Sequence, residues 1–134
     1  MKVVTLHQPL AFLAVSGVKT VENRGWRTPH RGWLLIHAGL SRESLDAELP
    51  AGIVRPPPAS LAFGALLGVV WLTACVQYGP DLEDNPWACG PWRWMLADAR
   101  PFKTPVPFRG ERGLFDVEVD EGLRNALEAV GVSV

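Results

Sequence analysis

The sequence predicts an α+β fold: a small, mixed or mostly antiparallel β-barrel with short helices around it. Its 134 residues fit one domain, and 48% hydrophobic and 20% charged residues are typical of a globular chain. The apolar runs are short, and those with strand character do not alternate regularly with helical patterns, as βαβ units would. We therefore expect one domain over residues 1–134, with five to six strands and two to three short flanking helices.

Three strands and one helix are predicted before residue 40. Residues 2–6 are typical of a short strand. Pro9 fits the first turn of a helix, because its missing N–H would be unpaired there in any case, and Gly17 suits the end of that helix. The other elements predicted here are a strand over residues 20–24, a proline-containing turn over 28–32 and a buried strand over 33–37.

The rest of the chain predicts a second helix, at least three strands and a final helix. Ser41 resembles an N-cap for a helix to about Leu49. Residues 62–77 are long enough for one bent strand or two, with glycines at 64 and 68 as bulge or close-approach points. The remaining predictions are an irregular loop over 50–60, a loop over 78–91, a strand over 92–96, a proline-punctuated connection over 101–110, a strand over 113–119 and a helix capped by Asp120 that ends near Gly131.

Several functional classes lack their sequence signals. No apolar run reaches the ~18 residues of a membrane span, and the N-terminus has no signal-peptide pattern, so we expect a cytoplasmic protein without a membrane partner. Phosphate-binding glycine loops and the GxSxG motif are absent, and no two histidines have the spacing of metal ligands. We expect neither a cofactor nor a metal.

Positive charge is concentrated in two segments. Residues 1–37 carry five basic side chains and one acidic one, and residues 93–112 carry five basic and two acidic ones, although the whole chain has a net charge of -1. If these segments lie side by side, they form a positive face that attracts a polyanion. The alternative is that the charges alternate around the surface and have no joint effect.

The densest group of polar residues lies between residues 19 and 31. In an extended strand Glu22, Arg24 and Trp26 share one face, and Lys19 joins them only if residues 17–19 form a turn. Trp26 could stack a nucleobase, a contact worth ~1–3 kcal/mol. These residues could also have purely structural roles. Lys19 would then be a solvated turn lysine, Glu22 and Arg24 an ion pair at the barrel rim, and His37 a core residue.

The same region resembles the ASCH (activating signal cointegrator homology) domain. Thirteen positions carry the resemblance: His7, Gln8, Pro9, Ala11, Leu13, Gly17, Lys19, Glu22, Arg24, Trp26, Thr28, Arg31 and Gly32. It continues in GALLGVVWLTAC (64–75), GPWRW (90–94), PVPFRG (105–110) and GLF (113–115). Leu10 stands where the family usually has a tryptophan.

This resemblance implies a PUA-like β-barrel with a nucleic-acid-binding cleft, most often for RNA. RNA is therefore the expected partner, with single-stranded or double-stranded DNA as the alternative. The residues expected to bind the nucleic acid are Gln8, Lys19, Glu22, Arg24, Trp26, Arg27, Arg31, Arg93 and Arg109.

Some members of the family are enzymes, so a second function stays open. One branch resembling this chain removes the acetyl group of N4-acetylcytidine, and another is proposed to cut RNA. Here the alternative is a metal-independent hydrolase with Lys19 and Glu22 as the reacting groups. Glu22 replaces the second threonine of the deacetylase pattern. A third possibility, a protein-interaction module, would need a contiguous apolar patch.

Overall fold

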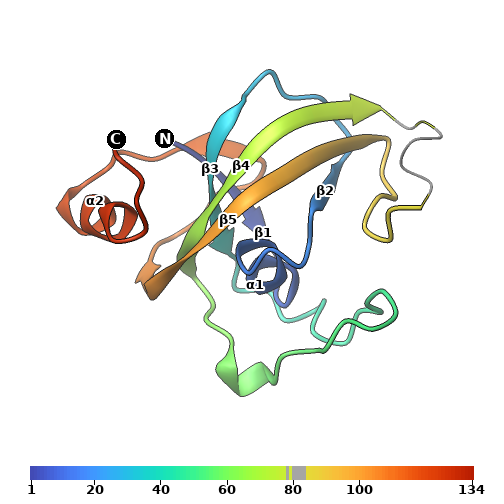
Figure 1. Ribbon diagram of the computed structural model, residues 1–134. Helices are drawn as coiled ribbons and strands as arrows, with labels where there is room; N and C mark the ends of the chain where they lie inside the picture. Colours follow the sequence, from blue (N-terminus) through green and yellow to red (C-terminus); the bar gives the residue numbers. More distant parts are fainter. Residues whose placement is uncertain (78, 80–83) are drawn as a thin grey trace.

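The computed structural model describes residues 1–77, 79 and 84–134, and these form a curled six-stranded mixed sheet with two helices (Figure 1). The predicted α+β class and small mixed barrel are confirmed, with the sheet shaped as a half-barrel. The elements in chain order are β1 (Lys2–Leu6), α1 (Leu10–Val15), β2 (Val21–Arg24), β3 (Gly32–Ala38), the 3-10 helix η1 (Pro58–Ser60), β4 (Ala65–Gln77), β5 (Trp92–Pro107), β6 (Leu114–Asp116) and α2 (Glu121–Glu128).

The strand order places the two ends of the chain in one sheet. It runs β2-β5-β4-β3-β1-β6, with β1 parallel to β3 and every other pair antiparallel. The register of β4 on β5 shifts three times. The strands approach so closely at Gly68 that a Cβ atom added there would lie 2.4 Å from the carbonyl oxygen of Arg100. Such bulges increase local twist and bend the long strands, which explains the curl.

A separate core covers each face of this sheet. Because neighbouring strand residues point to opposite faces, Leu34 and Ile36 pack towards α1 whereas Leu35 packs towards α2, and all three are fully buried. Burial on both faces explains why residues 33–36 of β3 form an unbroken apolar run. The Asp120 side chain accepts a hydrogen bond from the N–H of Leu123 at 2.9 Å, as the predicted N-cap of the last helix should.

The predicted helix over residues 41–49 is wrong. This segment contains only isolated turn hydrogen bonds, such as Ala47 N–H to Ser44 O at 3.0 Å. The guanidinium of Arg55 donates to the carbonyls of Leu45 and Ala47, which a helix would use for its own hydrogen bonds. A distant arginine therefore stabilises the irregular path.

The predicted proline connection over 101–110 is also wrong at its start, because β5 continues to Pro107. The neighbouring strand β2 pairs with β5 only from Arg24–Trp92 to Val21–Met95. Beyond Met95, this edge of β5 therefore has no pairing with β2. Prolines are tolerated on a strand edge whose N–H groups have no partner. Within the predicted loop over 78–91, residues 78 and 80–83 lie outside the described part of the chain.

Within the described residues, none of the helices has the length and apolar character to cross a membrane. The same residues contain no group of three or more His, Cys, Asp or Glu side chains placed to hold a metal ion.

Candidate functional site

Lys19 and Glu22 are in contact, through the turn that their spacing requires. Gly17 has a φ of +81°, and the N–H of Lys19 donates to Leu13 O at 2.9 Å, so the chain folds back after α1 before it enters β2. This turn brings Nζ of Lys19 to 3.0 Å from Oε1 of Glu22.

Arg24 completes a row of three charged side chains, which we call the ion triad (Lys19, Glu22 and Arg24). Nε of Arg24 lies 2.9 Å from Oε2 of Glu22, because alternate residues of β2 share a face. The triad is also bound to backbone, since Lys19 donates to Val21 O and Arg24 donates to Thr5 O at 3.0 Å. The three side chains are only 4%, 11% and 21% exposed. The triad therefore ties β2 to β1 from within the protein.

Trp26 forms an exposed aromatic platform next to the triad. It is 41% exposed, and its ring meets Trp94 edge-on, with centroids 5.0 Å apart and an interplanar angle of 81°. Trp94 is fully buried, its indole N–H donates to Trp26 O at 3.4 Å, and the guanidinium carbon of Arg24 lies 5.9 Å from its ring centroid. A rigid, buried support thus presents an indole to solvent.

Asn23 on the opposite face of β2 organises the segment before β5, a role that the sequence pattern did not reveal. Its amide nitrogen donates to Trp87 O at 2.6 Å, and its amide oxygen accepts the N–H groups of Cys89 and Gly90. Arg93 supports the same segment, because its Nε donates to Gly90 O at 2.8 Å. Arg93 is only 3% exposed, so it does not extend a positive surface.

Gln8 is inside the protein. It is fully buried, its Nε2 donates to Ala62 O at 2.8 Å, and its Oε1 accepts the N–H of Phe12 at 2.9 Å. The side chain therefore caps α1 and ties it to the segment before β4. Both ends of the amide are occupied within the chain, which leaves no group for a ligand.

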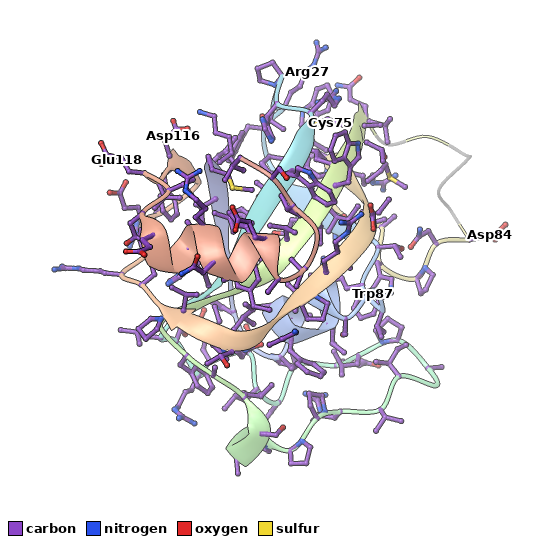
Figure 2. The ribbon with its side chains drawn as sticks, turned by 60° about the vertical axis from the view of Figure 1, so that its left-hand side comes forward. Arg27, Cys75, Asp84, Trp87, Asp116 and Glu118 are labelled. Carbon is purple, nitrogen blue, oxygen red and sulfur yellow. The ribbon has the colours of Figure 1, made fainter. Side chains whose placement is uncertain are left out.

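Four arginines supply the exposed positive charge around this region. Arg27 projects from the edge of the molecule (Figure 2), and Arg31 is exposed while donating to the carbonyls of its own turn. Arg109 and Arg112 are exposed and line a cavity. Arg112 was not among the predicted site residues, although it follows Arg109 closely in the second basic segment.

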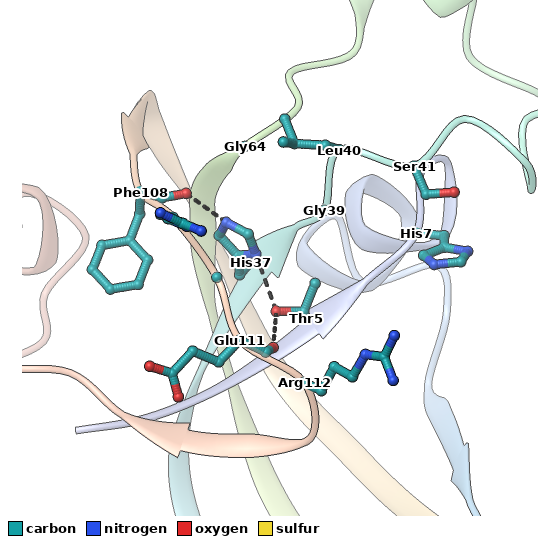
Figure 3. A pocket seen from close by; sticks show the side chains of 12 residues that line it. Thr5, His7, His37, Gly39, Leu40, Ser41, Gly64, Phe108, Glu111 and Arg112 are labelled. Carbon is teal, nitrogen blue, oxygen red and sulfur yellow. Dashed lines mark hydrogen bonds between the residues drawn. The ribbon is translucent and has the colours of Figure 1, made fainter.

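This cavity has a volume of about 620 Å³ and lies between the ends of β1 and β3 and residues 108–112 (Figure 3). The other side chains that line it are those of Thr5, His7, His37, Leu40, Ser41, Phe108 and Glu111. His37 forms its floor and is 2% exposed. The two basic segments of the sequence therefore adjoin here, as they do where β2 pairs with β5.

The hydrogen bonds of His37 show which ring nitrogen carries a proton when the ring is neutral. Nε2 lies 2.7 Å from Phe108 O, which can only accept, so Nε2 carries a proton. In the neutral ring Nδ1 is then an acceptor, 3.1 Å from Oγ1 of Thr5. The Thr5 hydroxyl also lies 3.0 Å from Glu111 O, so one proton serves two acceptors. Burial lowers the pKa of His37 below 6.5, partly opposed by the bond to Phe108 O, which keeps the ring neutral at pH 7.

We expect acid to destabilise the protein through His37. Because its pKa is lower in the folded state than in the unfolded state, its contribution to stability is complete above pH 6.5 and is lost as the pH falls from there towards the folded-state pKa. Urea unfolding between pH 7.5 and 5 should show a steeper loss for the wild type than for His37→Gln. Parallel curves for the two proteins would contradict this expectation.

Comparison with known families now identifies the domain. Residues 4–106 match the family described as the ASCH domain. The chain belongs to the ASCH domain family. The family is associated with nucleic acids.

Two curated relatives are the human and mouse proteins called activating signal cointegrator 1. The human protein is 30% identical over 139 aligned residues, which cover 92% of this chain and 24% of the relative. The mouse protein is 42% identical over 90 residues, which cover 61% of this chain and 16% of the relative. This ASCH domain thus spans about a quarter or less of the relatives' length.

Solved structures confirm the fold. The ASCH protein of Zymomonas mobilis superposes with a TM-score of 0.57 at 17% identity, over 99% of this chain and 96% of that chain. A single-residue mutant of the same protein gives a TM-score of 0.56, over 96% of both chains.

Proposed function

We propose that this ASCH domain binds single-stranded nucleic acid, with RNA ranked before DNA. The observation that carries the proposal is the exposed indole of Trp26, held edge-on by Trp94, with the exposed Arg27 next to it in the chain and Gly113, the neighbour of the exposed Arg112, beside its ring. An aromatic ring among cations provides base stacking and phosphate neutralisation together, without base-specific hydrogen bonds.

Two links connect Trp26 to the exposed arginines: a contact with Gly113 and the loop that follows Trp26 in the chain. The Cβ position of Gly113 lies 3.8 Å from Cζ2 of Trp26, so this ring lies beside the residue that follows Arg112. Arg27 and Arg31 come from the loop on the other side. We call Trp26, Arg27, Arg31, Arg109 and Arg112 the binding surface. The ion triad lies behind it and holds β2 in position.

The buried state of Lys19 favours binding over hydrolysis. Its ammonium group is in contact with Glu22 and Val21 O, and its side chain is only 4% exposed. Two of its three N–H donors are therefore occupied inside the protein, and a paired ammonium has no lone pair for attack. A second, smaller cavity of about 220 Å³ lies beside the turn after α1, and Lys19, Thr20 and Asp98 are among its lining residues.

Salt dependence tests the proposed function. If three or four phosphates are neutralised, log K for a single-stranded RNA oligomer should fall with log salt at a slope of roughly -2 to -3. Fluorescence anisotropy with an RNA and a DNA oligomer of the same sequence measures both slope and preference. A flat response would favour the protein-interaction alternative. Turnover of N4-acetylcytidine or of RNA that is lost in Lys19→Ala would replace binding by hydrolysis.

Trp26→Ala should weaken RNA binding by about 1–3 kcal/mol, or roughly 5- to 150-fold, because one stacking contact is lost. The chain offers a matched control in Trp71, which is also 41% exposed and meets Trp33 edge-on at 4.9 Å. Anisotropy titrations at one salt concentration should leave the affinity of Trp71→Ala unchanged. If Trp71→Ala weakens binding and Trp26→Ala does not, the ligand lies on another face of the sheet.

A further inference from the structure

We propose that the cavity above His37 binds one nucleotide, with the phosphate on Arg109 and Arg112 and the base against Leu40. This inference rests on the proposed function and adds to it a second contact, separate from the Trp26 platform. The nucleotide has two possible sources, which are a free mononucleotide and one unstacked nucleotide of a strand. The experiment below distinguishes them.

The wall of this cavity is held in place by the protein itself. The Cβ position of Gly110 lies 2.4 Å from Cε1 and Nδ1 of His37, so the backbone packs directly on the imidazole and leaves no room for a side chain. Phe108 O and Glu111 O on either side of this glycine are hydrogen-bonded to His37 and Thr5 (Figure 3). Residues 108–111 are therefore anchored at three points, and the cavity keeps its shape without a ligand.

The charges on the cavity favour an anion on its Arg112 side. In the part of the chain that the structure describes, Arg109 and Arg112 make neither a hydrogen bond nor an ion pair. The acidic groups nearby are Glu111, which points away from Arg112 in Figure 3, and Glu43, which lies 3.6 Å from Nδ1 of His7. Both guanidinium groups line the cavity and have donors free for an anion, and the proposal requires them to reach the oxygens of the same phosphate.

The rest of the cavity suits a flat ring. Leu40 is 77% exposed at its margin, and Gly39 and Gly64, which have no side chains, line the cavity beside it. A volume of about 620 Å³ lies within the range of roughly 300–1,000 Å³ typical of sites for organic ligands. A phosphate alone would leave most of this space empty, whereas a nucleotide uses both the apolar and the cationic part.

The direct test is an NMR titration with uridine and adenosine 5′-monophosphates, the parent nucleosides and inorganic phosphate. The nucleotides should shift the amide signals of Gly39, Gly64 and Gly110. Nucleosides should bind at least about tenfold more weakly, as should both nucleotides to the double variant Arg109→Ala/Arg112→Ala, because charge-assisted hydrogen bonds are lost. Inorganic phosphate should also bind at least about tenfold more weakly, because it has no base to contact the apolar part of the cavity. Lys103→Ala removes a charge from an exposed position of β5 outside the cavity and should bind like the wild type.

An RNA oligomer then identifies the source of the nucleotide. If the double variant weakens RNA binding and a mononucleotide competes with RNA, the cavity holds a nucleotide of the strand. If RNA binding is unchanged while mononucleotide binding is lost, the cavity holds a free nucleotide, and Arg109 and Arg112 do not belong to the binding surface for RNA.

Two results would overturn the inference: the three glycine signals do not move with any nucleotide or with RNA, or the double variant binds nucleotides as Lys103→Ala does. In either case RNA binding that depends on Trp26 would still support the proposed function. Conversely, nucleotide binding without any RNA binding would remove the proposed function and leave the cavity as a free-nucleotide site.

Discussion

Glu22→Gln should destabilise the folded protein by about 3 kcal/mol, measured by urea unfolding at pH 7. The carboxylate lies between two cations, 3.0 Å from Nζ of Lys19 and 2.9 Å from Nε of Arg24, and all three side chains are largely buried. Glutamine keeps the size of glutamate but removes the negative charge and replaces one of its two acceptor oxygens by an NH2 donor, which would face Lys19 or Arg24. Two cations would then lie close together with little water around them. Removing one partner of a buried ion pair typically costs about 3–5 kcal/mol, and the partial exposure of Arg24 places our value at the lower end.

A matched control separates this effect from the general loss of an acidic side chain. Asp116 is paired with Lys2 at 2.8 Å, but its side chain is 68% exposed. Asp116→Asn makes the same chemical change in water and should leave the unfolding midpoint unchanged, because solvent screens exposed pairs. If both variants unfold at the wild-type urea concentration, the triad is not what ties β2 to β1. An increase in stability of Glu22→Gln would contradict the expectation outright.

Trp94→Ala should cost about 3–5 kcal/mol of stability, the range for removing a large aromatic side chain from a core. Trp94 is fully buried on β5, opposite Glu22 of β2 on one side and Cys75 of β4 on the other. Its loss would leave a cavity under three strands and would take away the support of Trp26. Thermal unfolding followed by circular dichroism measures the change. Because typical domains have only about 5–15 kcal/mol of stability, this variant could fail to fold.

Trp94→Phe keeps the prediction testable in that case. Phenylalanine retains a ring in the core but loses the indole N–H that donates to Trp26 O, so we expect a loss of about 1–2 kcal/mol with a folded protein. RNA binding should weaken in Trp94→Phe, because the Trp26 platform loses its hydrogen bond to the core. A folded Trp94→Phe with wild-type affinity would show that the orientation of Trp26 does not depend on Trp94.

In the site, the sequence predicts which side chains share a face of β2, but it does not predict which side chains are buried. Strand alternation correctly predicts that Glu22 and Arg24 lie on one face, because that depends only on the local backbone period. Burial depends on segments far away in the sequence. Gln8 is buried because the segment near Ala62 packs over it, and Arg93 lies on β5 opposite Asn23 of β2, which is 70 residues earlier in the chain. An amide or a guanidinium has the same appearance in the sequence whether it faces water or a distant carbonyl.

The two errors in the predicted elements have the same origin. The segment after Ser41 has a cap residue and acidic residues typical of a helix start, but Arg55 takes the carbonyls that the helix would need. The prolines after Phe102 are typical of a connection, but β2 has already ended beside β5, so its edge needs no N–H donors. In the first case a side chain from outside the segment binds its carbonyl groups. In the second, the end of β2 leaves N–H groups of β5 without a strand partner, so prolines fit there.

The sequence by itself determined the α+β class and the ASCH family, because apolar periodicity and motif spacing are local properties. It left the approach of Lys19 to Glu22 conditional on a turn at residues 17–19. Only the tertiary structure decided which charged groups are exposed: the triad is mostly buried, whereas Arg109 and Arg112 line the cavity above His37. The physical reason is that the free energy of a charge depends on its solvent exposure and on the charges around it. Both are set by strands that come together from distant parts of the chain.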